Sequence, residues 1–278
     1  MKKEQVFVEE RKQAILDYVK ARKKAGVNEL CEKFGVSSAT IRNDLRDLEQ
    51  NRLLVRTHGG VMVQGQARFE PAAADKTVHH IDSKRHIAQA ALHMVEDGDT
   101  LVLDTGSTTL ELALLLSEKR NITILTNDIA IAAILENHPS AVVHLIGGII
   151  RKGFHCTVGG AALENLKNLT VDKAFMAANS FSLEKGASTP DLQQAELKRL
   201  MISIATKVFF LVDSSKFGRN SFAGFAPLEV IDSLISDTIS EEDKTVLEDK
   251  GIEVTEACPQ PAEGCAEDGM PGGSGRVE

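Results

Sequence analysis

The sequence predicts an α/β protein in which a small, mainly helical N-terminal domain precedes a larger domain built on a parallel sheet. Short apolar runs alternate with helical stretches from residue 81 to about 256, and a compact helix, turn, helix and hairpin pattern comes before them. The chain has 278 residues, of which 42% are hydrophobic. That length and composition suit about two packed domains.

The N-terminal pattern is clearest in VNELCEKFGVSSATIRNDLRDLEQNRLL, which begins at Val27. It predicts a short helix, a turn at Gly35 and Val36, and a second helix capped by Ser37 or Ser38. Apolar residues of the second helix recur at spacings of three and four and would pack on the first. Its outward face then carries short or donor-rich side chains suited to base edges and phosphates: Ser37, Ser38, Ala39, Thr40, Arg42, Asn43 and Arg46.

The next stretch, RLLVRTHGGVMV, predicts two short strands around a tight turn. Such a hairpin after two helices is typical of the wing of a winged helix-turn-helix domain, which we place at residues 9–64. Arg56, His58 and Gly59 are candidates for contact with the DNA backbone or minor groove. A hairpin that only closes the small domain is the alternative.

Charge is distributed unevenly along the chain. The net charge is −8, but residues 1–64 carry 13 Lys and Arg against 9 Asp and Glu, or +4, which leaves −12 for the remainder. A basic head on an acidic body suggests that the head binds a polyanion. A chance excess of lysine in one helix would give the same count.

The body has six candidate strands, and several of them are separated by helical sequence. Their apolar runs are continuous rather than alternating, which fits strands covered by helices on both faces. A doubly wound sheet follows, with ligand chemistry at the carboxyl ends of its strands. The candidate strands are TLVLDT, ITILTN, AVVHLIG, KAFMAAN, KVFFLVD and IEVTE.

The first strand runs into a hydroxyl-rich loop and then a helix. Backbone N–H groups and hydroxyls of such a turn can hold an anion, although the same sequence may serve only as a helix cap. Three further strand ends bring small or polar groups to the same edge of the sheet, and for the glycine pair a plain chain reversal is the alternative. The candidates are Gly106, Ser107, Thr108 and Thr109 in the loop, and Thr126, Asn127, Gly147, Gly148 and Asn179 at the other strand ends.

A family resemblance rests on particular residues of the head. Arg11, Ile15 and Val19, then Ser37, and then TIRNDL at 40–45 resemble the signature of the DeoR family of bacterial transcription regulators. The HGG turn of the wing is similar too, and the resemblance continues to about residue 257. It implies a Rossmann-like effector domain (81–257) similar in fold to ribose-5-phosphate isomerase, whose DTGST-like loop binds the sugar phosphate.

The resemblance also implies further effector-binding residues, namely Lys185, Glu196 and Lys216, and two more candidates are Asp104 at the end of the first strand and Arg151 after the glycine pair. The isomerase has a carboxylate-bearing segment where this chain has AANS at 177–180, and an uncharged amide is a poor general base. Ala177 also stands where the family usually has glycine, which puts the local shape of the pocket in doubt. We therefore expect ligand binding without catalysis, with no cofactor and no metal.

The expected function is repression of a carbohydrate operon, relieved when a phosphorylated sugar binds. Paired heads would read repeated half-sites of operator DNA, which calls for a homo-oligomer, a dimer or a tetramer. Alternatives are an effector-activated regulator, an isomerase-like enzyme with a DNA-binding head, and a nucleic-acid-binding protein with an inert body.

The remaining segments give weaker signals. Residues 65–80 lack a sustained period and are expected to form a linker, while residues 258–278 are rich in Pro and Gly and are expected to be a disordered tail. No apolar run approaches the length of a membrane span. The four cysteines, Cys31, Cys156, Cys258 and Cys265, have no zinc-like or redox spacing, so we expect reduced thiols in a cytoplasmic protein.

Overall fold

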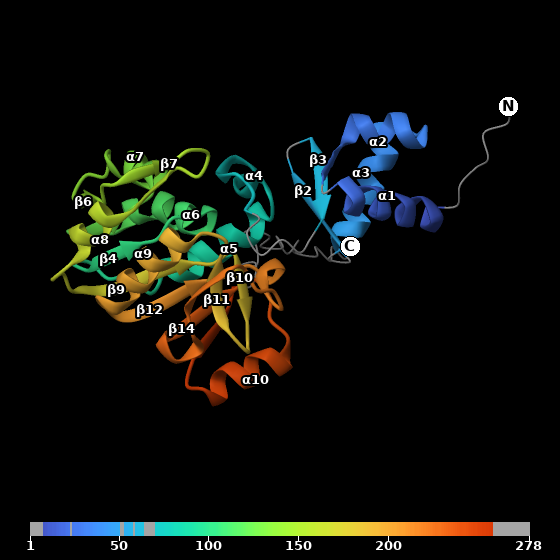
Figure 1. The fold of residues 1–278 in the computed structure, drawn as a ribbon. Helices are drawn as coiled ribbons and strands as arrows, with labels where there is room; N and C mark the ends of the chain where they lie inside the picture. Colours follow the sequence, from blue (N-terminus) through green and yellow to red (C-terminus); the bar gives the residue numbers. More distant parts are fainter. Residues whose placement is uncertain (1–7, 23, 51–52, 58, 64–69, 258–278) are drawn as a thin grey trace, which may run out of the picture.

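The computed structural model describes residues 8–22, 24–50, 53–57, 59–63 and 70–257, which form a small head and a larger body (Figure 1). The expected tail at 258–278 and His58 of the wing lie outside the described residues. None of the helices in the described ranges is long and apolar enough to cross a membrane.

The head has the predicted helix-turn-helix and wing. Helices α1 (Val8–Arg22), α2 (Val27–Phe34) and α3 (Ser38–Gln50) pack on a three-stranded sheet in the order β1-β3-β2. The strands are β1 (Lys24–Gly26), β2 (Leu54–Thr57) and β3 (Gly60–Val63). The apolar stripe of α3 faces α1 and α2, and the side chains that fill this core without any exposure are Ile15, Val19, Leu30, Ile41 and Leu45.

The body is built on a seven-stranded sheet in the order β15-β14-β12-β9-β4-β5-β6, with every neighbouring pair parallel. The strands are β4 (Thr100–Leu103), β5 (Thr123–Thr126), β6 (Val142–Leu145), β9 (Val171–Ala177), β12 (Ala205–Leu211), β14 (Ser233–Ser236) and β15 (Glu253–Glu256). All six predicted strands are present. The seventh strand, β14, with the sequence SLIS, was not predicted.

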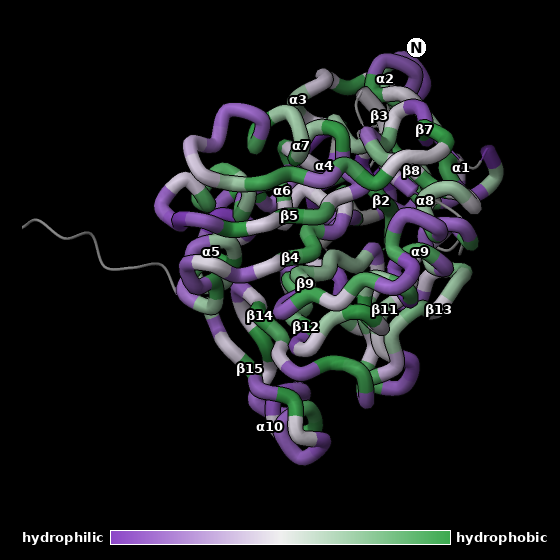
Figure 2. Tube along the Cα trace, turned by 90° about the vertical axis from the view of Figure 1, so that its left-hand side faces the viewer, coloured by the Kyte–Doolittle hydropathy of each residue, from purple (hydrophilic) through white to green (hydrophobic). Residues whose placement is uncertain are grey.

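Helices cover both faces of this sheet. On one face lie α5 (Ile81–Leu92), α6 (Ser107–Leu115) and α7 (Ile129–Leu135), and on the other α8 (Gly160–Leu166) and α9 (Leu192–Ser203). Side chains of β4 alternate between the two faces of the sheet. Leu101 and Leu103 pack in the core with α5, α6 and α7, and Val102 packs in the core with α8 and α9. Figure 2 shows the middle strands as mainly hydrophobic, in contrast to the hydrophilic α10 (Glu241–Asp249).

Two small sheets and three short helical turns complete the body. A hairpin of β7 (Ile149–Arg151) and β8 (Cys156–Val158) follows β6. A second antiparallel sheet, in the order β10-β11-β13, covers the face that carries α9. Its strands are β10 (Ser180–Ser182), β11 (Gly186–Thr189) and β13 (Ala223–Ala226), and the turns are η1 (Leu116–Glu118), η2 (Ser214–Lys216) and η3 (Leu228–Val230).

The segment expected to be a linker contains a helix. In its described part, α4 (Ala73–Val78) lies on the side of the body that faces the head (Figure 1). The Lys84 ammonium, only 3% exposed on α5, donates to the carbonyls of Lys76 and His79 and so fastens the end of α4. Burial lowers the pKa of Lys84 to about 8. Six residues are too few to show a helical period in the sequence, which is why α4 was missed.

Candidate functional site

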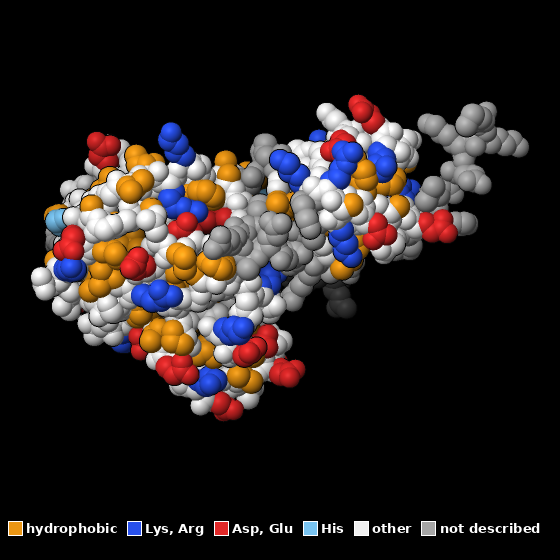
Figure 3. All heavy atoms as spheres, in the orientation of Figure 1, with side chains coloured by type: hydrophobic (Ala, Val, Ile, Leu, Met, Phe, Trp, Pro, Cys, Tyr) orange, Lys and Arg blue, Asp and Glu red, His pale blue; other side chains and the backbone are white. Residues whose placement is uncertain are grey.

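The outward face of α3 presents the residues that were predicted to contact DNA. Ser37 caps the helix, because its Oγ accepts a hydrogen bond from the backbone N–H of Thr40 at 3.2 Å. The side chains of Ser38, Ala39, Arg42, Asn43 and Arg46 are exposed, and Thr40 is half-buried. Lys and Arg side chains are spread over the visible face of the head in Figure 3. The face is therefore free to meet a polyanion.

A buried ion pair holds α3 against α1. The Arg11 guanidinium donates from Nε to Asp44 Oδ2 at 2.6 Å and from Nη2 to Oδ1 at 3.0 Å, and the Asp44 side chain is 4% exposed. Such a two-bond contact fixes orientation as well as distance. The first signature residue of the head thus positions α3 against α1.

In the wing, Arg56 is half-buried on β2, and its N–H donates to Glu49 Oε1 at 3.3 Å. Gly59 is exposed at the turn. The DNA contacts predicted for Arg56 and Gly59 stay predictions.

The body contains a cavity of about 190 Å³ at the carboxyl ends of β4, β5, β9 and β12. The chain continues from β4 to β5 and β6 on one side, and β9, β12, β14 and β15 lie on the other, so the cavity sits where the strand order reverses. This is the usual ligand position in open α/β sheets. Segment 70–77, with α4, forms another wall of it.

The loop between β4 and α6 has the shape of an anion cradle. A side chain at Gly106 would bring its Cβ within 2.6 Å of the Ala177 Cβ, so only glycine allows this close approach. The Thr109 hydroxyl donates to the carbonyl of Asp104 at 2.7 Å and stabilises the turn. The hydroxyls of Ser107 and Thr108 have no hydrogen-bond partner among the described residues, and both side chains line the cavity. They are available to a ligand at the N-terminus of α6.

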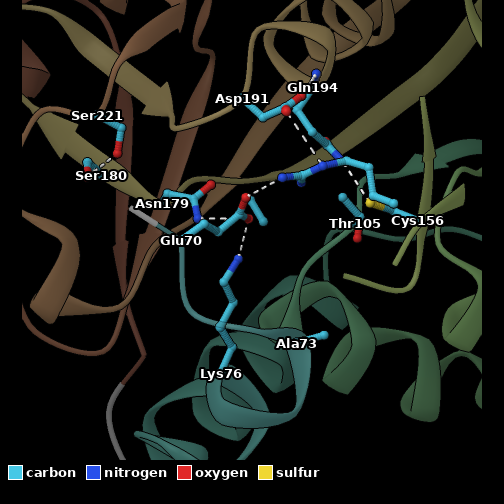
Figure 4. Close-up of polar contacts among 12 residues, drawn as sticks. Glu70, Ala73, Lys76, Thr105, Cys156, Asn179, Ser180, Asp191, Gln194 and Ser221 are labelled. Atoms are coloured by element: carbon cyan, nitrogen blue, oxygen red, sulfur yellow. Dashed lines mark hydrogen bonds and ion pairs between the residues drawn. The ribbon is translucent and has the colours of Figure 1, made fainter. Parts of the chain in front are cut away.

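Glu70 lies in the cavity between two cations (Figure 4). Its Oε1 is 2.6 Å from Lys76 Nζ and accepts from Asn179 Nδ2 at 3.3 Å, while its Oε2 accepts from Arg151 Nη2 at 3.0 Å. Burial alone would raise the pKa of Glu70, but the attraction of Lys76 and Arg151 outweighs it and holds the pKa below its ordinary value. Glu70 is therefore ionised at neutral pH.

Two further lysines line the cavity, and each has its own carboxylate. Lys198, 3% exposed on α9, contacts the carboxylate of Asp104 and donates to the carbonyl of Ala177 at 3.0 Å. Burial raises the pKa of Asp104, and Lys198 offsets this only in part. Lys216 Nζ lies 3.9 Å from Asp213 Oδ2. The cavity thus holds four cations beside a helix N-terminus, an arrangement suited to a phosphate.

Two buried polar atoms on the cavity wall have no hydrogen-bond partner within the described chain. They are Gln194 Oε1 and Thr189 Oγ1, on residues that are 2% and 1% exposed. An unpaired polar group that is out of reach of water costs about 1–3 kcal/mol. Both residues line the cavity, which makes them candidates to bind a ligand hydroxyl.

The predicted pocket residues fall into three groups. Gly106, Ser107, Thr108, Arg151, Asn179 and Lys216 line the cavity. A second group lies beneath it and supports the wall, comprising Asp104, Thr109, Thr126 and Asn127, all fully buried. A third group lies outside the cavity lining: Gly147, Gly148, Lys185 and Glu196.

The positions of the third group in the fold explain why these residues lie outside the cavity lining. The Gly147 N–H donates to Asn165 Oδ1 at 2.9 Å, and a Cβ at Gly148 would meet the Val158 carbonyl at 2.5 Å, so the pair serves the chain reversal. Lys185 is exposed in the turn between β10 and β11. Glu196 is exposed on α9, about 200° around the helix from Gln194, whereas Lys198 four residues after Gln194 shares its buried face.

Sequence reasoning missed Glu70, Lys76, Gln194 and Lys198. For the last two a signal existed, since polar residues spaced by four within QQAELKRLMISIA share one helix face with buried apolar residues. Glu70 and Lys76 gave none, because they belong to a segment without periodicity.

A helix-turn-helix head joined to a body with an anion-suited cavity defines the class of ligand-responsive DNA-binding regulators. Residues 11–67 match the DeoR-like helix-turn-helix domain, and residues 79–238 match the DeoR C terminal sensor domain. The chain belongs to the DeoR family of transcriptional regulators.

Two regulators match this chain over most of its length, and a solved isomerase structure matches about half of it. It is 34% identical over 248 residues to the HTH-type transcriptional regulator GlpR of Haloferax volcanii, covering 89% of this chain and 97% of that protein. It is 31% identical over 234 residues to the HTH-type transcriptional repressor GlcR of Bacillus subtilis, covering 84% and 90%. Ribose 5 phosphate isomerase A from Neisseria gonorrhoeae is 16% identical with a TM-score of 0.37, covering 48% of this chain and 52% of the isomerase.

Proposed function

We propose that this protein represses a carbohydrate operon by binding operator DNA through α3 and the wing, and releases it when a phosphorylated sugar enters the cavity. The observation that carries the proposal is the pairing of a free α6 N-terminus with four cationic side chains in one cavity. Names of relatives that refer to transcriptional regulation and repression support the same function. Such a protein would act in the cytoplasm, where operator DNA is found.

Ligand binding is tested first by thermal unfolding of the full chain with ribose 5-phosphate, fructose 6-phosphate and their unphosphorylated parents. A ligand that binds only the folded state raises the melting temperature. We expect stabilisation by at least one phosphorylated member of this panel and none by its parent sugar. Equal responses to both forms would contradict a phosphate-specific cavity.

The phosphate is expected to bind at the loop before α6. Replacing Ser107 and Thr108 together with valine keeps the bulk and removes two hydroxyls, and each charge-assisted hydrogen bond is worth roughly 1.5–3 kcal/mol. The variant should bind operator normally but need at least about a hundredfold more phosphosugar for release. Operator release followed by fluorescence anisotropy measures this. Ser117→Val, at an exposed serine of η1, is the control and should release as the wild type does.

The sugar hydroxyls are expected to meet Gln194 and Thr189, whose oxygens have no partner in the described chain. Gln194→Leu should weaken phosphosugar binding by about fivefold or more, the effect of a lost hydrogen bond of about 1 kcal/mol, and leave binding of inorganic phosphate unchanged. Gln193→Leu, at the exposed neighbouring position, should change neither. Calorimetric titration separates the two ligands, and equal losses for both would place Gln194 at the phosphate instead.

We propose that the cavity binds its ligand without converting it. Asn179 is an amide, which is a poor general base, and the carboxylate beside it, Glu70, is held in ion pairs with Lys76 and Arg151. Incubation of the full chain with pentose and hexose phosphates should give no aldose–ketose interconversion. Turnover above a buffer control would favour an enzyme that carries a DNA-binding head.

We further propose a homo-oligomer, since one small head per chain buries too little DNA to select a site in a genome. Four exposed apolar side chains on β6 and β7 give a surface for self-association: Val142, Leu145, Ile149 and Ile150. Because β6 is an edge strand, this surface lies at the end of the sheet. Figure 3 shows hydrophobic side chains at this end of the body.

A further inference from the structure

One carboxylate inside the cavity, that of Glu70, comes from the segment between the two domains. Glu70 is the first described residue of the body, seven positions after Val63 at the end of the head. Its side chain is 9% exposed and lies among cavity-lining residues, although it comes from the segment that joins the two domains. A carboxylate from the connecting segment thus reaches into the ligand site.

Glu70 is held by the kind of groups that hold a ligand's phosphate. Arg151 and Lys76 contribute two cations, and Asn179 contributes an amide donor. The Arg151 guanidinium also lies 4.1 Å from the ring centroid of Phe154, which restricts its orientation. A planar, oriented guanidinium suits carboxylate and phosphate equally well.

The other cations of the cavity are paired with carboxylates that follow strands, whereas the partners of Arg151 are Glu70 and, with Nε–Oδ2 at 3.6 Å, Asp191. Lys198 is paired with Asp104, which sits directly after a central strand, and Lys216 lies near Asp213 at the end of β12. Those carboxylates are fixed by the sheet. Glu70 instead lies on the connecting segment, so its release requires no change in the strands. A doubly charged phosphate at the α6 N-terminus would compete with Glu70 for Arg151 and Lys76.

We propose that Glu70 is a built-in occupant of the anion site, and that the phosphate of the effector displaces it. This inference rests on the proposed function and describes how ligand binding in the cavity alters the DNA-binding head. The bond between Glu70 and Arg151 belongs to the ligand-free arrangement. The phosphate breaks it, because both anions need the same cations.

The displaced contact lies next to the head. Lys76 belongs to α4, and the carbonyls of Lys76 and His79 are fastened by Lys84. His79, one residue after α4, lies within electrostatic range of Glu49 and Arg56 in the head. Losing the Glu70 contact therefore releases one partner of Lys76 on α4, the helix on the side of the body that faces the head. A ligand can change the arrangement of the head only if it binds one arrangement of the protein more tightly than the other.

Glu70→Gln tests the proposal, because it keeps the shape and removes the competing charge. Calorimetric titration of the full chain with inorganic phosphate and with ribose 5-phosphate and fructose 6-phosphate should show binding about tenfold tighter or more than in the wild type. The parent sugars should bind as before. Without ligand, the operator affinity of the variant should move toward that of the wild type saturated with phosphosugar. Glu164→Gln, in an exposed ion pair with Lys167, is the matched control and should behave as the wild type.

The outcomes separate this inference from the proposed function. If the wild type binds a phosphosugar and Glu70→Gln binds it equally or more weakly, the inference is overturned and the sensor function stands. Weaker binding would mean that Glu70 contacts the ligand directly. If the wild type binds no phosphosugar of the panel while the variant gains affinity for inorganic phosphate, the anion site stands and the sugar assignment fails. Tighter binding with unaltered operator affinity would overturn the link to the head.

Discussion

Replacing Arg42 and Arg46 together with alanine is expected to lower operator affinity by at least about thirtyfold, or roughly 2 kcal/mol. Both guanidinium groups are exposed on α3, on the side opposite the buried stripe of Ile41, Leu45 and Leu48. A lost phosphate contact should also reduce the dependence of affinity on salt concentration, because fewer counterions are released on binding. Fluorescence anisotropy at several salt concentrations measures both effects.

A charge-matched control separates contact from net charge. Arg85→Ala with Arg120→Ala removes two exposed arginines from the body and changes the total charge equally. Its operator affinity should stay within about twofold of the wild type, and phosphosugar binding should be intact in both variants. Equal losses in the two double variants would mean that α3 does not read the operator.

Lys198→Met is expected to destabilise the body by about 3–5 kcal/mol, since it leaves the fully buried Asp104 without its cation. Methionine retains the bulk of the side chain, so the loss reports mainly on charge. Chemical denaturation of the full chain measures it. Lys167→Met breaks an exposed ion pair on α8 and should cost less than about 1 kcal/mol.

The same variant should change its stability with pH. Burial raises the pKa of Asp104, and loss of Lys198 raises it further, so the folded state takes up a proton that the unfolded state lacks. Stability of Lys198→Met therefore improves as the pH is lowered from 7 toward 5. Adding Asp104→Asn should recover part of the lost stability at pH 7. If the two substitutions simply add, the lysine and the carboxylate are not coupled.

The fold followed from the sequence where local patterns and burial agree. The two helices of the reading head were predicted because the stripe of α3 and the cap at Ser37 both fit one helix. The candidate strands of the body include six of the seven strands of the large sheet. The short strands β14 and β1 were not predicted.

The candidate site was predicted less completely, because its residues converge from distant parts of the chain. The loop at Gly106 has a local signature in a strand that breaks into a hydroxyl-rich turn. Glu70 has none, since its partners Arg151 and Asn179 lie 81 and 109 residues away. Resemblance pointed to Glu196 on α9, whereas the helical spacing from Gln194 brings Lys198 to the cavity.

One titration tests the central claim most directly. The full-length protein is bound to its operator fragment, selected from the DNA flanking its gene, and ribose 5-phosphate, fructose 6-phosphate and their parent sugars are added in turn while anisotropy is followed. A single regulator with coupled sites predicts that at least one phosphosugar releases the operator at concentrations where its parent sugar has no effect. Operator affinity that no phosphosugar changes, in a protein that calorimetry shows to bind one of them, would contradict the account.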